Sequence, residues 1–223
     1  MIKCAVFDFD GTLVDSNDIK RDTFFNIVQS LDPSGEIVSQ VLKCWPAGDR
    51  YEKTRKIAEG LISKGYLPSS VSIDEWSTHL ASEYTLQCQE AIACCQEMPG
   101  ASQSLRELTE KGYLLFVNSA TPEQPLRELL KLRNWSHLFQ DVYGAENSKA
   151  NNLRKISRKT GTTNNEIVHI GDQLDDLQAT EEFGCQFIAM AATNSGPIGK
   201  VSPLAVQDLR ALSSLFLTLD KEA

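Results

Sequence analysis

Residues 2–16, IKCAVFDFDGTLVDS, combine a short apolar run with two aspartates, Asp8 and Asp10, that stand one residue apart. Residues 2–7 have the apolar, β-branched character of a fully buried strand, and Gly11 ends it. Like charges at this spacing repel each other, and burying either one without a partner costs on the order of several kcal/mol. A strand that ends in such a pair therefore indicates a site that uses both carboxylates.

The rest of the chain divides into two patterns. Residues 17–98 have helical periodicity, with breaks at Pro33, Pro46 and Pro68 and no strong strand. Beyond Pro99, helices and strands alternate. The predicted strands are at 113–117, 141–144, 166–170 and 185–190, and the predicted helices are at 101–111, from Pro122 at the first helical position (N1), and at 150–160, 173–183 and 205–219.

Alternation of apolar strands with helices predicts the α/β fold class, with three layers around a central parallel sheet. The helical block is then an all-helical domain inserted between the first and second strands of that sheet. The expected domains are a core of residues 1–16 and 99–223 and an inserted domain of residues 17–98.

The ends of the predicted strands carry the chemistry. In an open α/β sheet, ligands bind beyond the carboxyl ends of the strands. The residues there are acids, hydroxyls, an amide and one lysine: Asp8 and Asp10 after the first strand, Asn118, Ser119 and Thr121 after the second, Glu146 and Lys149 after the third, and Asp172, Asp175 and Asp176 after the fourth. Because they come from distant parts of the sequence, their convergence at one edge of the sheet predicts an active site.

At these positions the chain resembles the haloacid dehalogenase superfamily of phosphotransferases. The motifs that carry the resemblance are FDFDGT with Asp8 and Asp10, FVNSAT with Ser119, AENSKANN with Lys149, and IGDQLDD with Asp172 and Asp176. The resemblance covers essentially the whole chain and implies a Rossmann-like core with a helical cap, as in the phosphoglycolate phosphatase and β-phosphoglucomutase branch. Two positions depart from the family pattern. Asn118 replaces the usual apolar residue before the motif serine, and Ala150 stands where a proline often follows the lysine.

The resemblance implies a role for each carboxylate. Asp8 would be the nucleophile, because a carboxylate divides phosphate ester hydrolysis into two steps through an aspartyl phosphate. Asp10 would be the general acid for the leaving group and then the general base for water. The implied cofactor is Mg²⁺, bound by Asp8, Asp172 and the backbone carbonyl of Asp10, with Asp176 supporting the metal site through water or through Lys149.

Two further core residues complete the implied site. Ser119 would donate a hydrogen bond to a phosphoryl oxygen, and Lys149 would balance the charge of the acids and of the incoming phosphate. The helix dipole disfavours a lysine at the start of a helix, which favours a functional role for Lys149 over a solvated one.

The cap is expected to select the substrate. The loop CWPAGDRY is rich in turn residues, and Arg50 within it would clamp an anionic or hydroxyl-rich leaving group. The alternative for Arg50 is a surface ion pair with Asp49 or Glu52. Lys20 and Asn17, at the start of the first cap helix, are also expected to bind the substrate.

The bulk composition limits the partners. A formal net charge of −8 and a pI near 5.0 argue against nucleic acid or an anionic membrane as the main partner, but not against a small phosphorylated metabolite. The six cysteines form no CxxC pair, so they are expected to be reduced thiols and not zinc ligands. With no expected signal peptide or membrane span, the prediction is a cytoplasmic protein, a monomer or small homo-oligomer.

The predicted function is a Mg²⁺-dependent phosphatase for a small phosphorylated metabolite, either a phosphosugar or a phosphoglycolate-like compound. One alternative is a phosphomutase of the same superfamily, which would return the phosphoryl group to a second hydroxyl of a sugar. The other is a catalytically silent metabolite-binding protein on the same fold. A binding protein has no need for a nucleophile next to an acid, which favours the enzyme.

Overall fold

A computed structural model describes residues 1–46, 48–191 and 204–222 of the chain. The chain forms two compact units, which we describe separately. Unit 1 comprises Met1–Ser16 and Cys95–Ala223, and unit 2 comprises Asn17–Cys94. No helix within the described ranges is both long and apolar enough to cross a membrane.

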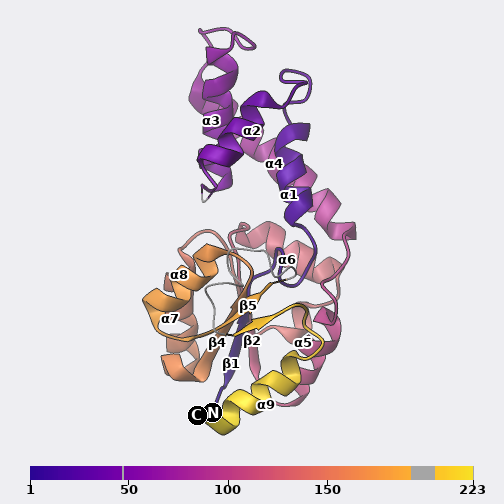
Figure 1. The fold of residues 1–223 in the computed structure, drawn as a ribbon, viewed down its shortest axis with the longest axis vertical. Helices are drawn as coiled ribbons and strands as arrows, with labels where there is room; N and C mark the ends of the chain where they lie inside the picture. The colour runs from indigo at the N-terminus through magenta and orange to yellow at the C-terminus, as the bar shows by residue number, and fades with distance from the viewer. Residues whose placement is uncertain (47, 192–203, 223) are drawn as a thin grey trace. The chain divides into compact units, whose positions relative to one another are not determined.

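Unit 1 is built on one sheet, in which every strand is parallel to its neighbours (Figure 1). The strand order is β3-β2-β1-β4-β5-β6. The strands are β1 (Cys4–Phe7), β2 (Leu114–Asn118), β3 (Asp141–Tyr143), β4 (Ile167–Gly171), β5 (Gln186–Met190) and β6 (Ala205–Val206). The predicted α/β fold class with a parallel sheet is confirmed.

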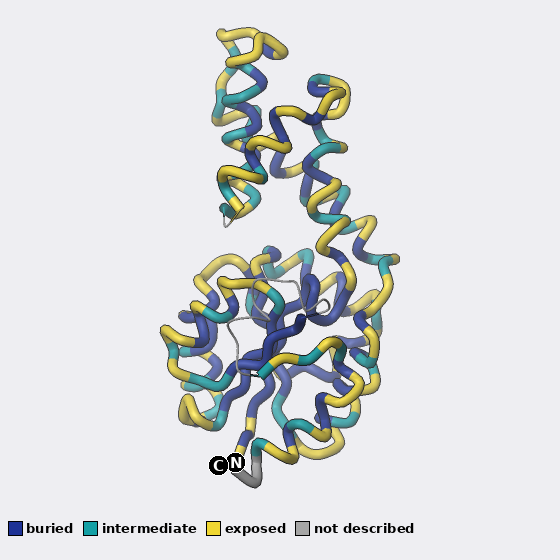
Figure 2. Tube along the Cα trace, in the orientation of Figure 1, coloured by how far each residue is buried: buried dark blue, intermediate teal, exposed yellow. Residues whose placement is uncertain are grey.

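The first strand lies in the middle of the sheet. In the register, Phe7 is paired with Val117 of β2 on one side and with Ile170 of β4 on the other. All four β1 residues are fully buried, and the central strands are buried along most of their length (Figure 2). The carboxyl end of β1 therefore lies between the carboxyl ends of β2 and β4, and Asp8 lies next to the residues that follow those two strands.

Helices cover both faces of the sheet, α7 and α8 on one side and α5 and α9 on the other (Figure 1). The helices of unit 1 are α5 (Ala101–Glu110), α6 (Glu123–Leu132), α7 (Lys149–Thr160), α8 (Leu174–Phe183) and α9 (Leu212–Glu222), with short 3-10 helices at Ser136–Leu138 and Asn164–Glu166. Leu153 and Ile156 of α7 pack on Val6 and Phe116 of the sheet. Burying side chains of this size stabilises the fold by about 1.5–3 kcal/mol each, so α7 is fixed on the sheet below the lysine that begins it.

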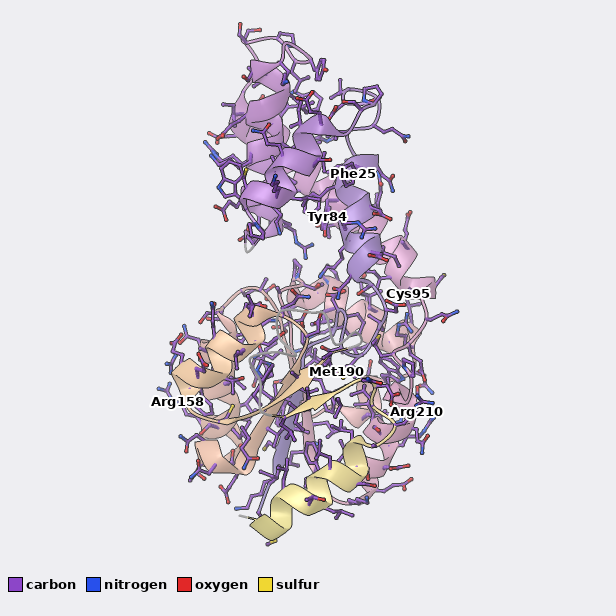
Figure 3. The ribbon with its side chains drawn as sticks, viewed as in Figure 1. Phe25, Tyr84, Cys95, Arg158, Met190 and Arg210 are labelled. Atoms are coloured by element: carbon purple, nitrogen blue, oxygen red, sulfur yellow. The ribbon has the colours of Figure 1, made fainter. Side chains whose placement is uncertain are left out.

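The described residues of unit 2 form helices joined by turns, with no strand among them. Its helices are α1 (Asn17–Asn26), α2 (Glu36–Cys44), α3 (Arg50–Ser63) and α4 (Ile73–Cys94). The rings of Phe24 on α1 and Tyr84 on α4 stack with centroids 4.2 Å apart. Before α2, Gly35 has a φ of +66°, and a β-carbon there would meet the ring of Phe25, which lies with Tyr84 in this unit (Figure 3). The Asp49 side chain accepts a hydrogen bond from the backbone N–H of Glu52 and so caps α3.

Two local predictions were wrong. The predicted helix at 205–219 is instead the short strand β6 followed by α9, because the backbone N–H groups of Ala189 on β5 and of Ala191, just after β5, bond to the carbonyls of residues 204 and 206. Pro122 does not occupy the first helical position of α6. It is the extended residue that precedes the helix, with φ −54° and ψ 145°.

Candidate active site

Asp8 is the first residue after β1 and is 4% exposed. Its backbone N–H donates to the carbonyl of Ile170 on β4, so the parallel pairing of the strands continues to this residue. Its Oδ1 atom accepts a 2.7 Å hydrogen bond from the backbone N–H of Phe9. These two bonds fix both the backbone and the carboxylate of Asp8 at the carboxyl edge of the sheet.

Lys149 forms ion pairs with three carboxylates of the site. It begins α7, where the Ser148 side chain caps the helix by accepting from the N–H of Asn151, and it is only 8% exposed. Its Nζ atom lies 2.6 Å from Asp176, 3.1 Å from Asp175 and 3.2 Å from Asp8. The solvated alternative for this lysine is therefore excluded by its burial, and one cation serves three carboxylates.

The electrostatics of this cluster differ from those of a surface ion pair. Burial raises the pKa of Asp8 to about 7, although Lys149 acts in the opposite direction. Burial likewise raises the pKa of Asp176 to about 7, again against the effect of Lys149. Burial alone would lower the pKa of Lys149, but the carboxyl groups of Asp176, Asp8 and Asp175 raise it well above its ordinary value. The lysine is thus held as a cation, and the acids compete for it.

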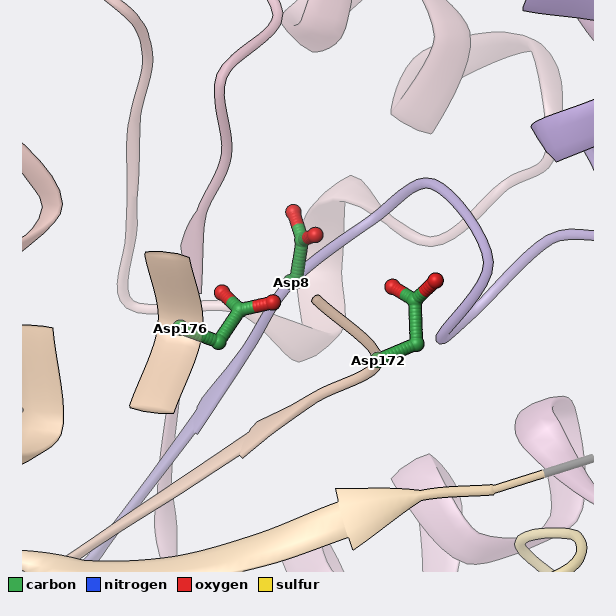
Figure 4. Close-up of side chains that lie close together, drawn as sticks. All are labelled: Asp8, Asp172 and Asp176. Carbon is green, nitrogen blue, oxygen red and sulfur yellow. The ribbon is translucent and has the colours of Figure 1, made fainter. Parts of the chain in front are cut away.

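Asp172 and Asp176 bring two more carboxylates from the end of β4 and the start of α8. Figure 4 shows Asp8, Asp172 and Asp176 side by side, and one carboxylate oxygen from each lies within 4.8 Å of the others. Gly171 makes this arrangement possible, because a β-carbon at that position would lie 2.3 Å from the carboxyl carbon of Asp176. Three clustered carboxylates are ligands of the hard oxygen type that suits Mg²⁺.

The three carboxylates are not equivalent. Asp176 accepts from Lys149 through Oδ1 and from the backbone N–H of Gln173 through Oδ2, so both of its oxygens already have donors. Asp172 accepts from the Thr12 hydroxyl at 3.3 Å and from the exposed Gln173 side chain. The donors to Asp172 are side chains that can rotate away, which leaves Asp172 better suited to direct metal ligation than Asp176.

Asp10 lies apart from this acid cluster in its bonding. Gly11, with a φ of +75°, turns the chain immediately after it. The Asp10 carboxylate is 5% exposed and accepts from two hydroxyls, that of Ser16 at 2.7 Å and that of Thr121 at 2.8 Å. Each carboxylate oxygen thus has its own hydroxyl donor, from two separate segments of unit 1.

Ser119 follows β2 and is 2% exposed. Its backbone N–H donates to the carbonyl of Tyr143 on β3, and its hydroxyl oxygen accepts from the N–H of Thr121 at 3.2 Å. Because the oxygen accepts from the backbone, the hydroxyl hydrogen remains available to an acceptor.

The predicted substrate residues of the cap all lie in unit 2. Asn17 and Lys20 are in the first turn of α1, and Arg50 begins α3. The Arg50 guanidinium donates to the Thr85 hydroxyl at 3.0 Å and lies over the Tyr84 ring at 5.5 Å. These contacts hold Arg50 on the surface of α4, and its role toward a substrate stays a prediction.

Sequence reasoning missed the hydroxyls that surround the acids. Thr12, Ser16 and Thr121 are all buried and bond to Asp172 or Asp10. Thr121 was visible as a strand-end residue, but nothing in the pattern paired it with an acid 111 positions away. For Thr12 and Ser16 the available signal was their position two and six residues after Asp10.

A parallel sheet with acids and one lysine converging beyond the carboxyl ends of its strands defines an α/β enzyme. The chain belongs to the haloacid dehalogenase-like hydrolase family, which matches residues 5–190. The resemblance drawn from the motifs is thereby confirmed.

Similar proteins agree with this placement. Phosphoglycolate phosphatase of Aliivibrio fischeri is 26% identical over 222 residues, which cover 93% of this chain and 92% of that protein. Among solved structures, one described as a predicted phosphoglycolate phosphatase from Haemophilus somnus has a TM-score of 0.78 at 16% identity, over 96% of this chain and 98% of that one. A β-phosphoglucomutase from Clostridium difficile has a TM-score of 0.73 at 15% identity, over 100% and 99%. The structural likenesses establish the fold, and the family and its curated relatives indicate a phosphatase.

Proposed function

We propose that the chain is a Mg²⁺-dependent phosphatase that hydrolyses a small phosphorylated metabolite through an aspartyl phosphate on Asp8. The observation that carries the proposal is the buried contact of Asp8 with Lys149, 3.2 Å apart, inside a cluster of acids at the carboxyl edge of the sheet. Stability alone does not explain such a cluster, because burying several carboxylates around one cation costs more free energy than an apolar core of the same volume.

The acid cluster fits a divalent cation. Asp8 and Asp172 would bind Mg²⁺ through their carboxylates, with the backbone carbonyl of Asp10 as a third ligand and Asp176 holding Lys149 beside them. When bound, the ion would neutralise charge between the nucleophile and the phosphoryl oxygens.

In the first step, a carboxylate oxygen of Asp8 attacks phosphorus, and the bond from phosphorus to the ester oxygen breaks. Asp10 gives a proton to that oxygen as it leaves, which yields the free alcohol. Ser119 donates its hydroxyl hydrogen to a phosphoryl oxygen, and Lys149 offsets the charge that this oxygen and Asp8 share. The product of the step is the phosphorylated Asp8.

In the second step, Asp10 takes a proton from a water molecule, whose oxygen attacks the phosphorus of the aspartyl phosphate. The bond between phosphorus and the Asp8 oxygen breaks, which releases inorganic phosphate and restores both carboxyl groups. The hydroxyls of Ser16 and Thr121 suit this exchange, because a hydroxyl can donate to a carboxylate and then rotate to accept from a carboxylic acid.

The substrate class is proposed as phosphoglycolate-like or phosphosugar. Curated relatives over nearly the full length of the chain are named phosphoglycolate phosphatase, which favours the first. The substrate is expected to be recognised by Arg50, Lys20 and Asn17 of the cap. All six cysteines are free thiols, which supports a reducing, cytoplasmic location.

The test uses Asp8→Asn, a variant with the same shape and no nucleophile. Phosphate release from an aryl phosphate in the presence of Mg²⁺ should fall to the background of the assay, while circular dichroism and the melting temperature show an intact fold. Asp141→Asn, which changes an acid outside the site, should keep full activity. Undiminished turnover by Asp8→Asn would contradict the mechanism.

The wild-type protein also distinguishes a phosphatase from a phosphomutase and from a catalytically silent binding protein. Incubation with a panel of phosphorylated metabolites and with a sugar bisphosphate distinguishes release of inorganic phosphate from transfer to a second hydroxyl. Transfer without net phosphate release would identify a phosphomutase, and no reaction with any compound would favour the silent binding protein.

A further inference from the structure

Two buried asparagines tie the first turn of α7 to the sheet. Asn118, the last residue of β2, donates from Nδ2 to the backbone carbonyl of Lys149 at 3.0 Å. Its Oδ1 atom accepts from Nδ2 of Asn152 at 3.0 Å, and the same Asn152 amide donates to the carbonyl of Gly144 at 3.1 Å. Asn118 and Asn152 are 0% and 1% exposed. The turn that carries Lys149 is thus bonded to β2 and to the segment after β3.

Burying this pair of amides in the core costs free energy. A buried amide must satisfy every donor and acceptor to avoid a penalty. The Oδ1 atom of Asn152 has no hydrogen-bond partner among the residues that the structure describes. Two apolar side chains of similar shape would fill the same space with no amide left to satisfy, and would lose only the donors to the carbonyls of Lys149 and Gly144. Stability of the core therefore does not account for the pair.

The position of the pair relative to Lys149 suggests what it does. The lysine Nζ holds three carboxylates at 2.6–3.2 Å, and a shift of its backbone by about 1 Å would take these contacts beyond hydrogen-bond length. A proline after the lysine would restrict the backbone of this turn through its ring, but this chain has Ala150 there. The restraint on the turn comes instead from the side chains of Asn118 and Asn152.

We propose that Asn118 and Asn152 are positioning residues for Lys149, which hold its backbone so that Nζ reaches Asp8 and Asp176 together. The inference rests on the proposed function, in which Lys149 offsets charge at the reacting phosphate. Positioning of Lys149 also accounts for an asparagine at position 118, where the family pattern has an apolar residue. Neither asparagine needs to touch the substrate, and both act through the lysine.

The experiment compares Asn118→Leu, Asn152→Leu and the double variant, because leucine has the branched shape of asparagine without its polar atoms. For each we would measure kcat and KM with an aryl phosphate, the inhibition constant of inorganic phosphate, and the melting temperature. Each variant should lose about 10- to 100-fold in kcat/KM, the range found when groups that orient a ligand are removed. Inhibition by phosphate should weaken in parallel.

The double variant separates positioning from stability. Each single variant removes the bond between the two amides and leaves one polar group of the remaining amide unpaired, so both should melt below the wild type. The double variant should melt no lower than Asn152→Leu, because both lack the donor to the Gly144 carbonyl and the double variant has no unpaired amide, and it should still have the low activity. Ser157→Ala is the matched control, since the Ser157 hydroxyl bonds to the carbonyl of Thr162 at the other end of α7. It should lower the melting temperature and leave kcat/KM and phosphate inhibition unchanged.

The proposal would be overturned if the double variant kept kcat/KM within about twofold of the wild type. It would also be overturned if activity followed the melting temperature across all variants, Ser157→Ala included. Lys149→Met, measured alongside, tells the two levels apart. If Lys149→Met is inactive and the double variant is active, the positioning role of the asparagines is refuted and the role of the lysine stands. If Lys149→Met is active, the proposed role of the lysine is refuted, and the inference about the asparagines is refuted with it.

Discussion

The pH dependence of metal binding tests the buried acid cluster most directly. Burial raises the pKa of Asp8 to about 7 from an ordinary value of 3.8. A carboxyl group binds a divalent cation in its ionised form, so a proton on Asp8 must leave when the cation binds. Lowering the pH from 8 to 6 therefore makes protons compete with Mg²⁺ for the proposed nucleophile.

The size of the effect follows from that pKa. Roughly nine tenths of the Asp8 carboxyl groups carry a proton at pH 6 and roughly one tenth at pH 8. The apparent affinity for Mg²⁺ should therefore fall about tenfold from pH 8 to pH 6, equivalent to about 1.4 kcal/mol. Close to one proton should be released per ion bound at pH 6. Asp176 titrates in the same range and shares Lys149, so any contribution it makes would add to this release.

Calorimetric titration of Mg²⁺ into metal-free protein at pH 6 and pH 8, each in two buffers of different ionisation enthalpy, counts these protons. Asp141→Asn is the control, because hydrogen bonds from Arg127 and Lys159 outweigh burial and hold the pKa of Asp141 at about 2, so this acid is ionised at both pH values. Equal affinity at the two pH values, with no proton release at pH 6, would show that Asp8 is already ionised in the free protein and refute the reasoning.

Further outcomes follow from the same site. Asp10→Asn should lose about 10²- to 10⁴-fold with an alkyl phosphate, whose leaving group needs a proton, and much less with an activated aryl phosphate; steady-state rates on the two substrates check this, and equal losses would count against the general acid. Thr121→Val removes a hydroxyl donor from Asp10 and should lower kcat by about 10- to 100-fold and shift its pH profile; an unchanged profile would contradict the pairing. Gly171→Ala should destabilise unit 1 by about 1–3 kcal/mol in urea unfolding and abolish turnover, since its β-carbon would displace Asp176. In EDTA, the stability linked to the raised pKa values of Asp8 and Asp176 is complete below their ordinary values and lost as the pH rises through about 7; the melting temperature should thus fall from pH 5 to pH 8, and added Mg²⁺ should offset the fall.

The strand ends were predictable because the sheet obeys one rule. Apolar runs of strand length alternating with helices imply parallel strands, and parallel strands carry their ends to one edge. Asp8, Lys149 and Asp172 could therefore be grouped from the sequence alone, and the structure places them in one cluster.

The hydrogen bonds between these elements could not be predicted in the same way. Whether Thr121 bonds to Asp10 or to its own backbone depends on distances of a few tenths of an ångström, which periodicity does not encode. Asn118 was visible as a strand-end amide and as a departure from the family pattern, but nothing linked it to Lys149, and its partner Asn152 gave no signal. The strand β6 was missed because two residues are too few to show alternation, and its existence depends on the open edge of β5.

The central position of β1 in the sheet also determines when this strand can form its pairings during folding. Its neighbours in the sheet are β2 and β4, which begin at residues 114 and 167, and Thr12 bonds to Asp172 across 160 positions of sequence. During synthesis at about 5–20 residues per second, many seconds therefore pass between the synthesis of β1, which Asp8 follows, and that of its second partner β4. Pairings over such distances close slowly, because loop entropy is lost before the contacts form. Catalytic activity would then appear only after β4 has paired with β1, so that its recovery during refolding reports that step.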